Sequence, residues 1–542
     1  MRTYVKQLFD AAAQKLPYLN EVPVFFESPK QESHGDLACS AAMMLARYLK
    51  RRPLDIANEI VAELKYDPAI IEKVEIAPPG FINIRFTHNY TSGIIPAILK
   101  KGESFGKSDI YSGKRAMVEF VSANPTGPLT VGHGRNAVSG DTIASLLEWI
   151  GYTVDREYYF NNAGRQMRVL GDSVKYRYLQ LLGEQIDFPE DHYQGEYIID
   201  IAKKLHEQYG DSLRENAPAD LFKDTAEKEI FADIEKTLRS IGIVFQNYYN
   251  ENSLYTDGKI DDVMKLFKEK NLSYESEGAT WLKLSEMGQD ADKVIIKSTG
   301  EPTYRLPDIA YHTTKFNRGY DLMVDLFGSD HNATYTDVLA GLKALGYDTE
   351  KVKVLIHQFV TIMQGKEIVK MSTRKANFIT LDELIAETGK DAVRYFFNMR
   401  SITTHLNFDL EIAKKQTDEN PVFYLQYAHA RICSIMRMAE EQKIGLTDNP
   451  AGGLSHEDEI RLLRKLWQFE NEVLIAAENF EPQRITVYLE DLAGLFHRFY
   501  TSCRIIGSEQ TVAEARLTLC AAVRQTIKNG LQILGVSAPE RM

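Results

Sequence analysis

Apolar and polar positions alternate with two periodicities, helical and strand-like. The order of these helical and strand-like stretches divides the chain into three parts. Residues 1 to about 100 mix helical spacing, at 37–52 and 55–65, with strand-like alternation at 73–86. This mixture predicts a small α+β domain. The segment 100–114 is rich in Gly, Ser and Lys, a composition typical of a linker.

The middle part begins with a strand-like run at 116–121, followed by a loop at 124–136 that is punctuated by Pro and Gly. Residues 136–153 have helical periodicity, with apolar side chains at positions 138, 143, 146, 147 and 150, and 154–160 is again strand-like. Strand, helix and strand in this order form a βαβ unit. The unit predicts a doubly wound parallel sheet.

Downstream, the pattern predicts a long helical insertion to about residue 270 and a short antiparallel patch at 279–284 and 293–306. Strand-like runs return at 321–331 and 351–360, and Thr380 to Glu383 fit a capping box that opens a helix. From about residue 420 the chain reads as nearly all helix, which predicts a helical bundle.

The expected fold is therefore a multidomain α/β protein with a Rossmann-like, doubly wound domain in the middle. We place a small α+β domain at 1–105, the Rossmann-like domain at 106–415 with an insertion at about 165–295, and an α-helical bundle at 416–542. The length of 542 residues is enough for three to four domains.

Composition narrows the class of protein. Apolar residues make up 44% and charged residues 26%, and no run approaches the roughly 20 apolar residues that cross a membrane. The N-terminal stretch is broken by charges, unlike a signal peptide. Cys39, Cys433, Cys503 and Cys520 are far apart and form no CxxC pair, which indicates a reducing, cytoplasmic location and argues against a cysteine-built zinc site.

The net charge of −12 is unusual for a nucleic-acid-binding protein, which normally carries a basic footprint. Local patches on an acidic protein can still be basic. From Asp491 onward there are six Lys and Arg residues, at 498, 504, 516, 524, 528 and 541, against four Asp and Glu residues, at 491, 509, 514 and 540. The balance lowers the expectation of RNA binding without excluding it.

The loop 124–136, NPTGPLTVGHGRN, is a candidate phosphate site. A turn between a parallel strand and a helix N-terminus directs backbone N–H groups and a positive dipole end toward an anion. Gly132 lets a ligand approach the backbone, and His133 could donate to a phosphate oxygen as charge develops. Taken alone, the loop favours the simpler interpretation, a proline-rich turn whose histidine caps a helix, over a phosphate site.

A second candidate is the loop 366–377, KEIVKMSTRKAN, after a strand pair with a turn at Gln364 and Gly365. Its cations, Lys370, Arg374 and Lys375, could compensate the charge of a leaving pyrophosphate. The simpler alternative is a solvated basic hairpin.

Together the two loops resemble the HxGH and KMSKS signatures of class I aminoacyl-tRNA synthetases. Further stretches resemble the arginyl-tRNA synthetases and extend the match over essentially the whole chain: HGDLAC and PPGFINIRF near the N-terminus, NPTGPL, YFNNAGRQM, TYRLPDIAYH, DAVRYFF, FYLQYAHARICSI and LGVSAPERM. The resemblance implies an arginine–tRNA ligase. Such an enzyme joins L-arginine to ATP as an adenylate, releasing pyrophosphate, and then transfers the arginyl group to tRNA(Arg).

The resemblance also implies roles for individual residues. Positioning and charge stabilisation would dominate the rate, with Mg²⁺ arriving on ATP and no dedicated protein metal site. Catalytic roles fall on His133, Lys370, Arg374 and Lys375. ATP contacts fall on Thr130, Gly132, His133, Gly328, Asp330, Met371 and Ser372.

The arginine substrate needs carboxylates at fixed positions, because a guanidinium is a planar fork of donors. Glu119, Tyr304 and Asp308 match the family's guanidinium contacts, and Asn124 and Gln358 match contacts to the arginine backbone. Singly, Glu119 could be a solvent-facing strand residue and Asp308 a helix N-cap.

Two positions depart from the family pattern. Thr130 stands where the family usually has the first histidine of HxGH, and Thr373 stands where it usually has the second lysine of KMSKS. Some relatives lacking that lysine carry one in the loop before HxGH, but this chain has Gly127 there. We expect Arg374 or Lys375 to replace the missing lysine.

The flanking domains are expected to contact tRNA. Phe81 and Asn83 match positions that meet the outer corner of tRNA, and Tyr500 and Met542 match positions that read the anticodon loop. Core packing is the alternative for the two aromatic residues. The expected enzyme is a monomer. The competing hypotheses are a synthetase-like RNA-binding protein without catalysis and a class I synthetase of another specificity.

Overall fold

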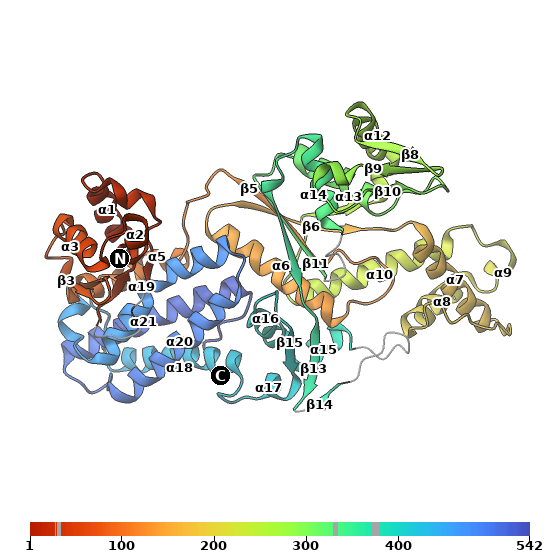
Figure 1. Cartoon of the computed structure of the whole chain (residues 1–542). Coiled ribbons are helices and arrows are strands. Elements are labelled where there is room, and N and C mark those ends of the chain that lie inside the picture. The colour runs from red at the N-terminus through yellow and green to blue at the C-terminus, as the bar shows by residue number, and fades with distance from the viewer. Residues whose placement is uncertain (28, 30–33, 329–333, 366, 370–378) are drawn as a thin grey trace.

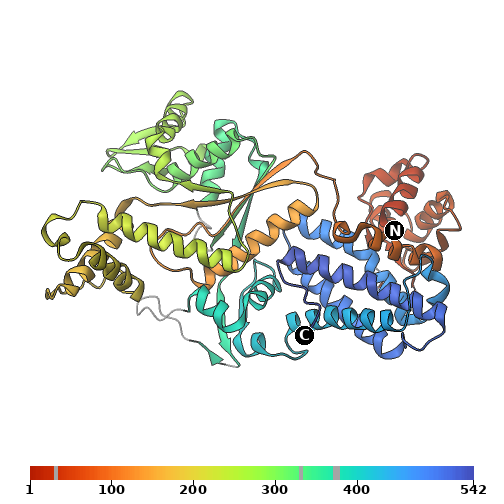
Figure 2. The same cartoon turned by 180° about the vertical axis from the view of Figure 1, so that it is seen from behind.

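The computed structural model describes residues 1–27, 29, 34–328, 334–365, 367–369 and 379–542. At one end of the molecule the N-terminal region lies against the C-terminal helices. A parallel sheet occupies the middle, and helices α7 to α9 lie at the opposite end (Figures 1 and 2).

The N-terminal region is a four-stranded antiparallel sheet packed with helices around one apolar core. The strand order is β1-β2-β4-β3. This arrangement agrees with the predicted α+β class. The elements are α1 (Arg2–Ala13), β1 (Phe26–Glu27), β2 (Leu37–Cys39), α2 (Ala41–Leu49), α3 (Pro53–Glu63), β3 (Ile71–Ala77) and β4 (Phe81–Phe86).

The segment 100–114, expected as a linker, is packed against the C-terminal helices over its first half. It begins inside helix α5 (Ile94–Lys101), which follows the short helix α4 (His88–Ser92). Phe105 is buried and stacks on Phe469, and Asn529 donates hydrogen bonds to the carbonyl oxygens of Gly102 and Phe105, at 2.9 and 2.8 Å. The linker interpretation fails here because sequence composition does not show an apolar anchor such as Phe105.

The central sheet is five-stranded and parallel, with strand order β12-β11-β5-β6-β7. Its strands are β5 (Arg115–Glu119), β6 (Thr153–Phe160), β7 (Asn247–Asn250), β11 (Leu322–Gly328) and β12 (Val352–His357). Helix α6 (Val131–Trp149) connects β5 to β6, which confirms the predicted βαβ unit. A Cβ at Gly140 would come within 2.3 Å of the Phe120 side chain, so α6 packs closely on the strand end.

Two insertions extend this sheet. Between β6 and β7 lie α7 (Gly164–Leu181), α8 (Glu196–Tyr209), α9 (Leu213–Asn216) and α10 (Leu221–Ser240). Between β7 and β11 lie α11 (Asn252–Thr256), α12 (Lys259–Glu269), α13 (Arg305–Asn317) and an antiparallel sheet of β8 (Ser273–Ser276), β9 (Ala279–Leu282) and β10 (Lys293–Ile296). This sheet is the predicted antiparallel patch.

After β11, helix α14 (Tyr335–Leu345) leads to β12, and a small sheet follows with the order β14-β13-β15. The expected hairpin is present, with Gln364 of β13 (Val360–Gln364) paired to Glu367 of β14 (Glu367–Ile368). Thr380 and Glu383 form the predicted capping box at the start of α15 (Leu381–Thr388). The remaining elements here are α16 (Lys390–Asn398), β15 (Leu406–Asp409) and α17 (Leu410–Lys414).

The C-terminal part is a helical bundle of α18 (Pro421–Glu441), α19 (Glu457–Glu478), α20 (Gln483–Ser502) and α21 (Gln510–Leu534). The Trp467 indole of α19 donates a 2.8 Å hydrogen bond to the carbonyl oxygen of Thr91, and Arg464 pairs with Asp36 at 2.5 Å. These contacts join the bundle to the N-terminal region. In the described part of the chain, no helix has the length and apolar character needed to cross a membrane.

Candidate active site

The predicted site residues gather where strands β5, β11 and β12 end and helix α6 begins. Because parallel strands direct their carboxyl ends to one edge, this edge is the usual ligand site of a doubly wound sheet. Glu119 ends β5, Gly328 ends β11, and Gln358 directly follows β12. Glu119 and Asp325 are partners in the β5–β11 register.

Helix α6 begins with a reciprocal cap between Thr130 and His133. The Thr130 hydroxyl accepts from the His133 backbone N–H at 3.5 Å, and Nδ1 of His133 accepts from the Thr130 backbone N–H at 3.2 Å. Because Nδ1 accepts, the neutral imidazole carries its proton on Nε2. Burial, with a smaller effect of His357, lowers the His133 pKa to about 4, so the ring is neutral at pH 7.

The backbone around this cap is open at Gly132. Among the described residues beyond the backbone of its own helix, a Cβ there would meet only the Thr130 hydroxyl, at 3.7 Å, so these residues leave room beside the first turn of α6. Gly127 has less room, because a Cβ would lie 3.0 Å from the Tyr197 hydroxyl. The remaining predicted ATP and catalytic residues lie outside the described residues: Asp330, Lys370, Met371, Ser372, Arg374 and Lys375, together with Thr373.

The crossover from β5 to α6 has strained backbone that the sequence did not reveal. Val121 and Ser122 have φ values of 66° and 42°, a region that side-chain-bearing residues rarely adopt. Asn136 of α6 holds this turn, since its carbonyl accepts from the Val121 N–H at 2.6 Å and its amide donates to the Leu326 carbonyl at 3.1 Å. The strand ends are thereby fixed relative to the helix.

Arg135 positions the segment after β12 in a similar way, and sequence reasoning missed it as well. Its guanidinium is fully buried and donates to the Gln358 carbonyl at 2.8 Å and to the Ser401 carbonyl at 2.9 Å. Burial lowers its pKa to about 10, so it remains charged at neutral pH. These bonds place Gln358 at the same edge as His133.

Three carboxylates gather on the other side of the site. Glu119 is 3% exposed, so it is not a solvent-facing strand residue, and α13 is capped by Tyr304, so Asp308 is not the N-cap. Burial, with Glu119 and Glu251 nearby, raises the Asp308 pKa to about 7. Glu251, whose own pKa is raised by burial, accepts a 2.8 Å hydrogen bond from Tyr159 and was not predicted.

A buried lysine stands beside these acids. Lys315 Nζ donates to Glu119 Oε2 at 2.5 Å and to Asp325 Oδ1 at 2.7 Å, and the Ser122 hydroxyl donates to Glu119 Oε1 at 3.1 Å. Among the described residues, carboxylates therefore outnumber cations on this side of the site. Such a surface is suited to binding a small cation.

The other two predicted arginine contacts lie at the rim. The Asn124 amide donates to Gln166 at 2.9 Å, and its carbonyl accepts from the Asn161 N–H at 3.0 Å. Tyr304 is 81% exposed and is free to change its conformation without loss of core packing.

Comparison with known proteins agrees with this geometry. A family model for the class I tRNA synthetase (R) catalytic domain matches residues 94–401, one for the arginyl tRNA synthetase N terminal domain matches 3–86, and one for the DALR anticodon binding domain matches 425–542. The arginine–tRNA ligase of Salinibacter ruber is 49% identical over 100% of this chain and 99% of its own length. That of Desulfotalea psychrophila is 49% identical over 95% and 94%.

The chain belongs to the arginyl-tRNA synthetase family. A Campylobacter jejuni structure described as an arginyl-tRNA synthetase is 32% identical, with a TM-score of 0.78 over 84% of this chain and 100% of that one. The Thermus thermophilus arginyl-tRNA synthetase structure, 21% identical, has the same fold, with a TM-score of 0.78 over 99% of this chain and 100% of that one.

The four positions predicted to contact tRNA differ in exposure. Phe81 is half-buried, whereas Asn83 is only 6% exposed, so its side chain has little surface to offer to RNA. The Tyr500 hydroxyl accepts a 2.8 Å hydrogen bond from Arg431, whose guanidinium lies 4.7 Å from the centre of the ring. Met542 is 56% exposed.

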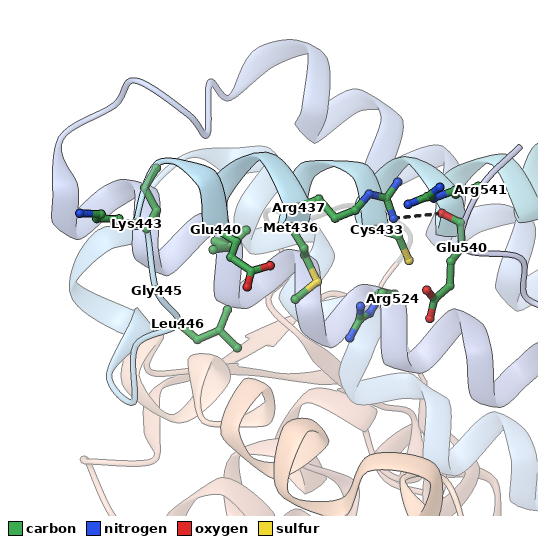
Figure 3. A pocket seen from close by; sticks show the side chains of 12 residues that line it. Cys433, Met436, Arg437, Glu440, Lys443, Gly445, Leu446, Arg524, Glu540 and Arg541 are labelled. Carbon is green, nitrogen blue, oxygen red and sulfur yellow. Dashed lines mark hydrogen bonds between the residues drawn. The ribbon is translucent and has the colours of Figure 1, made fainter.

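A pocket of about 630 Å³ lies near Met542, between α18 and α21 (Figure 3). Arg437 donates to the Glu540 carbonyl at 3.4 Å across its rim. The charged side chains that line it are basic at 437, 443, 524 and 541 and acidic at 440 and 540. The pocket is thus a local basic surface on an acidic protein.

Proposed function

We propose that this chain is an arginine–tRNA ligase. It joins L-arginine to ATP as arginyl-adenylate with release of pyrophosphate, and then transfers the arginyl group to tRNA(Arg). The observation that carries this proposal is one sheet edge with two parts: the N-terminus of α6 with its neutral His133, and a group of buried and half-buried carboxylates that includes Glu119 and Asp308. The first half suits phosphates and the second suits a guanidinium.

In the arginine half, Glu119 and Asp308 accept the guanidinium, and Tyr304 closes over it from the rim. Asn124 and Gln358 hold the amino and carboxylate groups of the substrate, with Gln358 kept in place by Arg135. Glu251 joins the predicted set, because it raises the pKa of Asp308 and therefore shares its surroundings. A substrate cation relieves the repulsion among these carboxylates.

In the ATP half, the substrate carboxylate attacks the α-phosphorus, and charge builds on the phosphate oxygens as pyrophosphate leaves. The Nε2–H of His133 donates to those oxygens, and Lys370 with Arg374 and Lys375 neutralises the leaving group. Thr130, Gly132, Gly328, Asp330, Met371 and Ser372 surround the nucleotide. A preorganised donor of this kind is worth about 10²–10³ in rate.

Mg²⁺ is proposed to arrive with ATP. Within the described residues no group of three or more His, Cys, Asp and Glu side chains is placed to hold a metal ion. Phosphate oxygens are the usual ligands of Mg²⁺ at nucleotide sites. When bound there, the ion lowers the negative charge of the leaving pyrophosphate.

The flanking regions are proposed to bind tRNA. Residues 1–105 meet the outer corner of the tRNA through Phe81, whose strand β4 also carries the buried Asn83. Residues 416–542 read the anticodon through Tyr500 and Met542, beside the basic pocket of Figure 3. Residues 106–415 form the catalytic domain, with the insertion at about 165–295. We propose a monomeric, cytoplasmic enzyme.

The proposal is tested by charging purified tRNA with each amino acid in turn, in the presence of ATP and Mg²⁺. We expect arginyl-tRNA to accumulate and no other amino acid to be attached above background. If tRNA binds but no amino acid is attached, the chain is an RNA-binding protein without catalysis. If another amino acid is attached, the acidic half of the site does not select a guanidinium.

A further inference from the structure

We infer that Asp325 and Lys315 are positioning residues that set the charge of the arginine pocket: Asp325 shares Lys315 with Glu119, so Glu119 keeps charge available for a guanidinium. This inference rests on the proposed function, because it explains how that site distinguishes a cationic substrate from a neutral one. Neither residue needs to touch the substrate.

The geometry shows one ammonium shared by two carboxylates. Lys315 Nζ lies 2.5 Å from Glu119 Oε2 and 2.7 Å from Asp325 Oδ1, and all three side chains are almost completely buried. Glu119 and Asp325 occupy partnered positions on β5 and β11, while Lys315 comes from α13 above them. Two strands and one helix thus fix the three charges.

Helix α13 links Lys315 to Asp308, because both residues lie on this helix. Positions 308, 312 and 315 lie on one face of this helix, because side chains four and seven residues apart point the same way. Nε2 of His312 lies 3.0 Å from Asp325 Oδ2, and Nδ1 of His312 lies 2.7 Å from the Asp308 carbonyl oxygen. A continuous hydrogen-bonded chain therefore joins the Glu119 carboxylate to the backbone of Asp308, the other predicted guanidinium acceptor.

The net charge of these side chains explains how the hydrogen-bonded chain could affect binding of a guanidinium. Two ionised carboxylates and one ammonium leave a net charge of −1 on Glu119, Asp325 and Lys315. Both ring nitrogens of His312 face acceptor oxygens, so this imidazole donates from both and adds one positive charge, which the ionised Asp308 carboxylate offsets. The five side chains therefore also carry −1, and an incoming guanidinium brings that charge to zero. Without the Asp325 charge, Lys315 and Glu119 would neutralise each other and offer little to a second cation. The second oxygen of Glu119, Oε1, accepts a hydrogen bond from the neutral Ser122 hydroxyl, and no cation among the described residues pairs with it, so it can accept from a guanidinium.

Fold stability alone is a weak explanation for this arrangement. Three buried charges carry a large desolvation cost, and apolar side chains of similar volume usually stabilise a core as well or better. Lys315 also lies 4.3 Å from the centre of the Tyr311 ring, which gives it further support. A buried ammonium that is held by carboxylates on two strands is better explained by the charge it imposes.

The test measures binding of arginine and of citrulline by calorimetry, using the full chain. Citrulline has the shape of arginine but carries a neutral urea group, so the ratio of the two dissociation constants reports the charge recognition. Asp325→Asn keeps the shape of the side chain and removes its charge. We expect it to weaken arginine binding about tenfold or more, to leave citrulline binding within about twofold, and to leave ATP binding unchanged.

A double variant separates charge from structure. Lys315→Met with Asp325→Asn removes one positive and one negative charge, so Glu119 regains a net charge of −1. We expect the double variant to recover the preference for arginine over citrulline that Asp325→Asn loses. If Asp325→Asn alone does not fold, the double variant still has to discriminate between the two ligands as the unaltered chain does.

Asp141→Asn is the matched control, since Asp141 is another buried carboxylate of this domain shared by two cations, Arg156 and Arg394. It should lower thermal stability without changing the arginine-to-citrulline ratio. The inference is overturned if Asp325→Asn keeps the wild-type ratio, or if the double variant discriminates no better than Asp325→Asn. Failure of the unaltered chain to charge tRNA with arginine would instead overturn the proposed function.

Discussion

The backbone N–H of Thr130 donates a 3.2 Å hydrogen bond to Nδ1 of His133. In return, the Thr130 hydroxyl accepts from the His133 backbone N–H at 3.5 Å, so the threonine that stands where the family usually has the first histidine of its signature serves as a helix cap. Thr130 caps helix α6, and His133 completes the cap from the third helical position. The cap orients the imidazole and leaves its proton on Nε2, where a phosphate oxygen can accept it.

His133→Ala is expected to slow adenylate formation by about 10²–10³, because it removes one preorganised donor to the developing charge. The dissociation constant of ATP should change far less, since Thr130 and the backbone remain. Single-turnover kinetics with labelled ATP measure the step directly. Thr130→Ser, which keeps the cap, is the control and should stay close to wild type. A His133→Ala rate within threefold of wild type would contradict the assigned role.

Asp308→Asn is expected to stabilise the ligand-free protein at pH 8 while weakening arginine binding. The folded-state pKa is about 7 against an ordinary value of 3.8, so between pH 4 and 7 the folded state binds more protons than the unfolded state. Stability from this group therefore falls as the pH rises through that window. The asparagine variant escapes this loss.

We expect the Tm of Asp308→Asn to exceed that of the unaltered chain by about 2 °C or more at pH 8 and to match it near pH 4. Arginine affinity should fall about 10- to 100-fold, because a charge-assisted hydrogen bond is lost. Thermal scans at the two pH values and calorimetry measure both effects. An unchanged or lower Tm at pH 8 would show that the carboxyl is not destabilised by burial.

Arg374→Ala combined with Lys375→Ala is expected to slow adenylate formation by about 10²-fold or more, since the pair replaces the lysine that Thr373 displaces. Each single variant should be milder if the two cations substitute for one another. Restoring the family residue with Thr373→Lys should recover most of the rate in the double variant. An unaffected rate in the double variant would remove both residues from the catalytic set.

Arg394→Met is expected to destabilise the junction between the catalytic domain and the bundle. Its buried guanidinium donates to the carbonyl oxygens of Leu534 and Ile241, at 2.7 and 2.9 Å, and to Asp141 at 2.6 Å. Breaking a buried ion pair typically costs about 3–5 kcal/mol. Thermal unfolding and limited proteolysis should both reveal the loss. Lys101→Met, which breaks an exposed pair with Glu470, should cost about 1 kcal/mol or less, and an equal effect of the two variants would refute the distinction.

Local patterns predicted the architecture because they depend on neighbouring residues. Apolar periodicity predicts β5, α6 and β6 in order, and the Thr380 capping box follows from four consecutive residues. Both are confirmed. The capping box of helix α6 was harder to recognise from the sequence, since histidine rather than glutamate or glutamine occupies the third position after Thr130.

The supporting residues of the site could not be predicted because their partners are distant in sequence. Lys315 lies in a helix and resembles a solvated surface cation, yet its carboxylate partner Glu119 is 196 positions away. Glu251 and Arg135 likewise gain their roles only when the insertion and the strand ends come together. These ordinary charged residues become candidates for a role in the site because they are buried, and their burial follows from the tertiary fold.

Arginine-dependent exchange of labelled pyrophosphate into ATP, with and without tRNA(Arg), tests the central claim most directly. An enzyme that forms arginyl-adenylate at this sheet edge should catalyse exchange when arginine is present, in at least one of the two conditions. Exchange should fall to background when citrulline replaces arginine. No exchange under either condition, from a folded protein that still binds tRNA, would contradict the account.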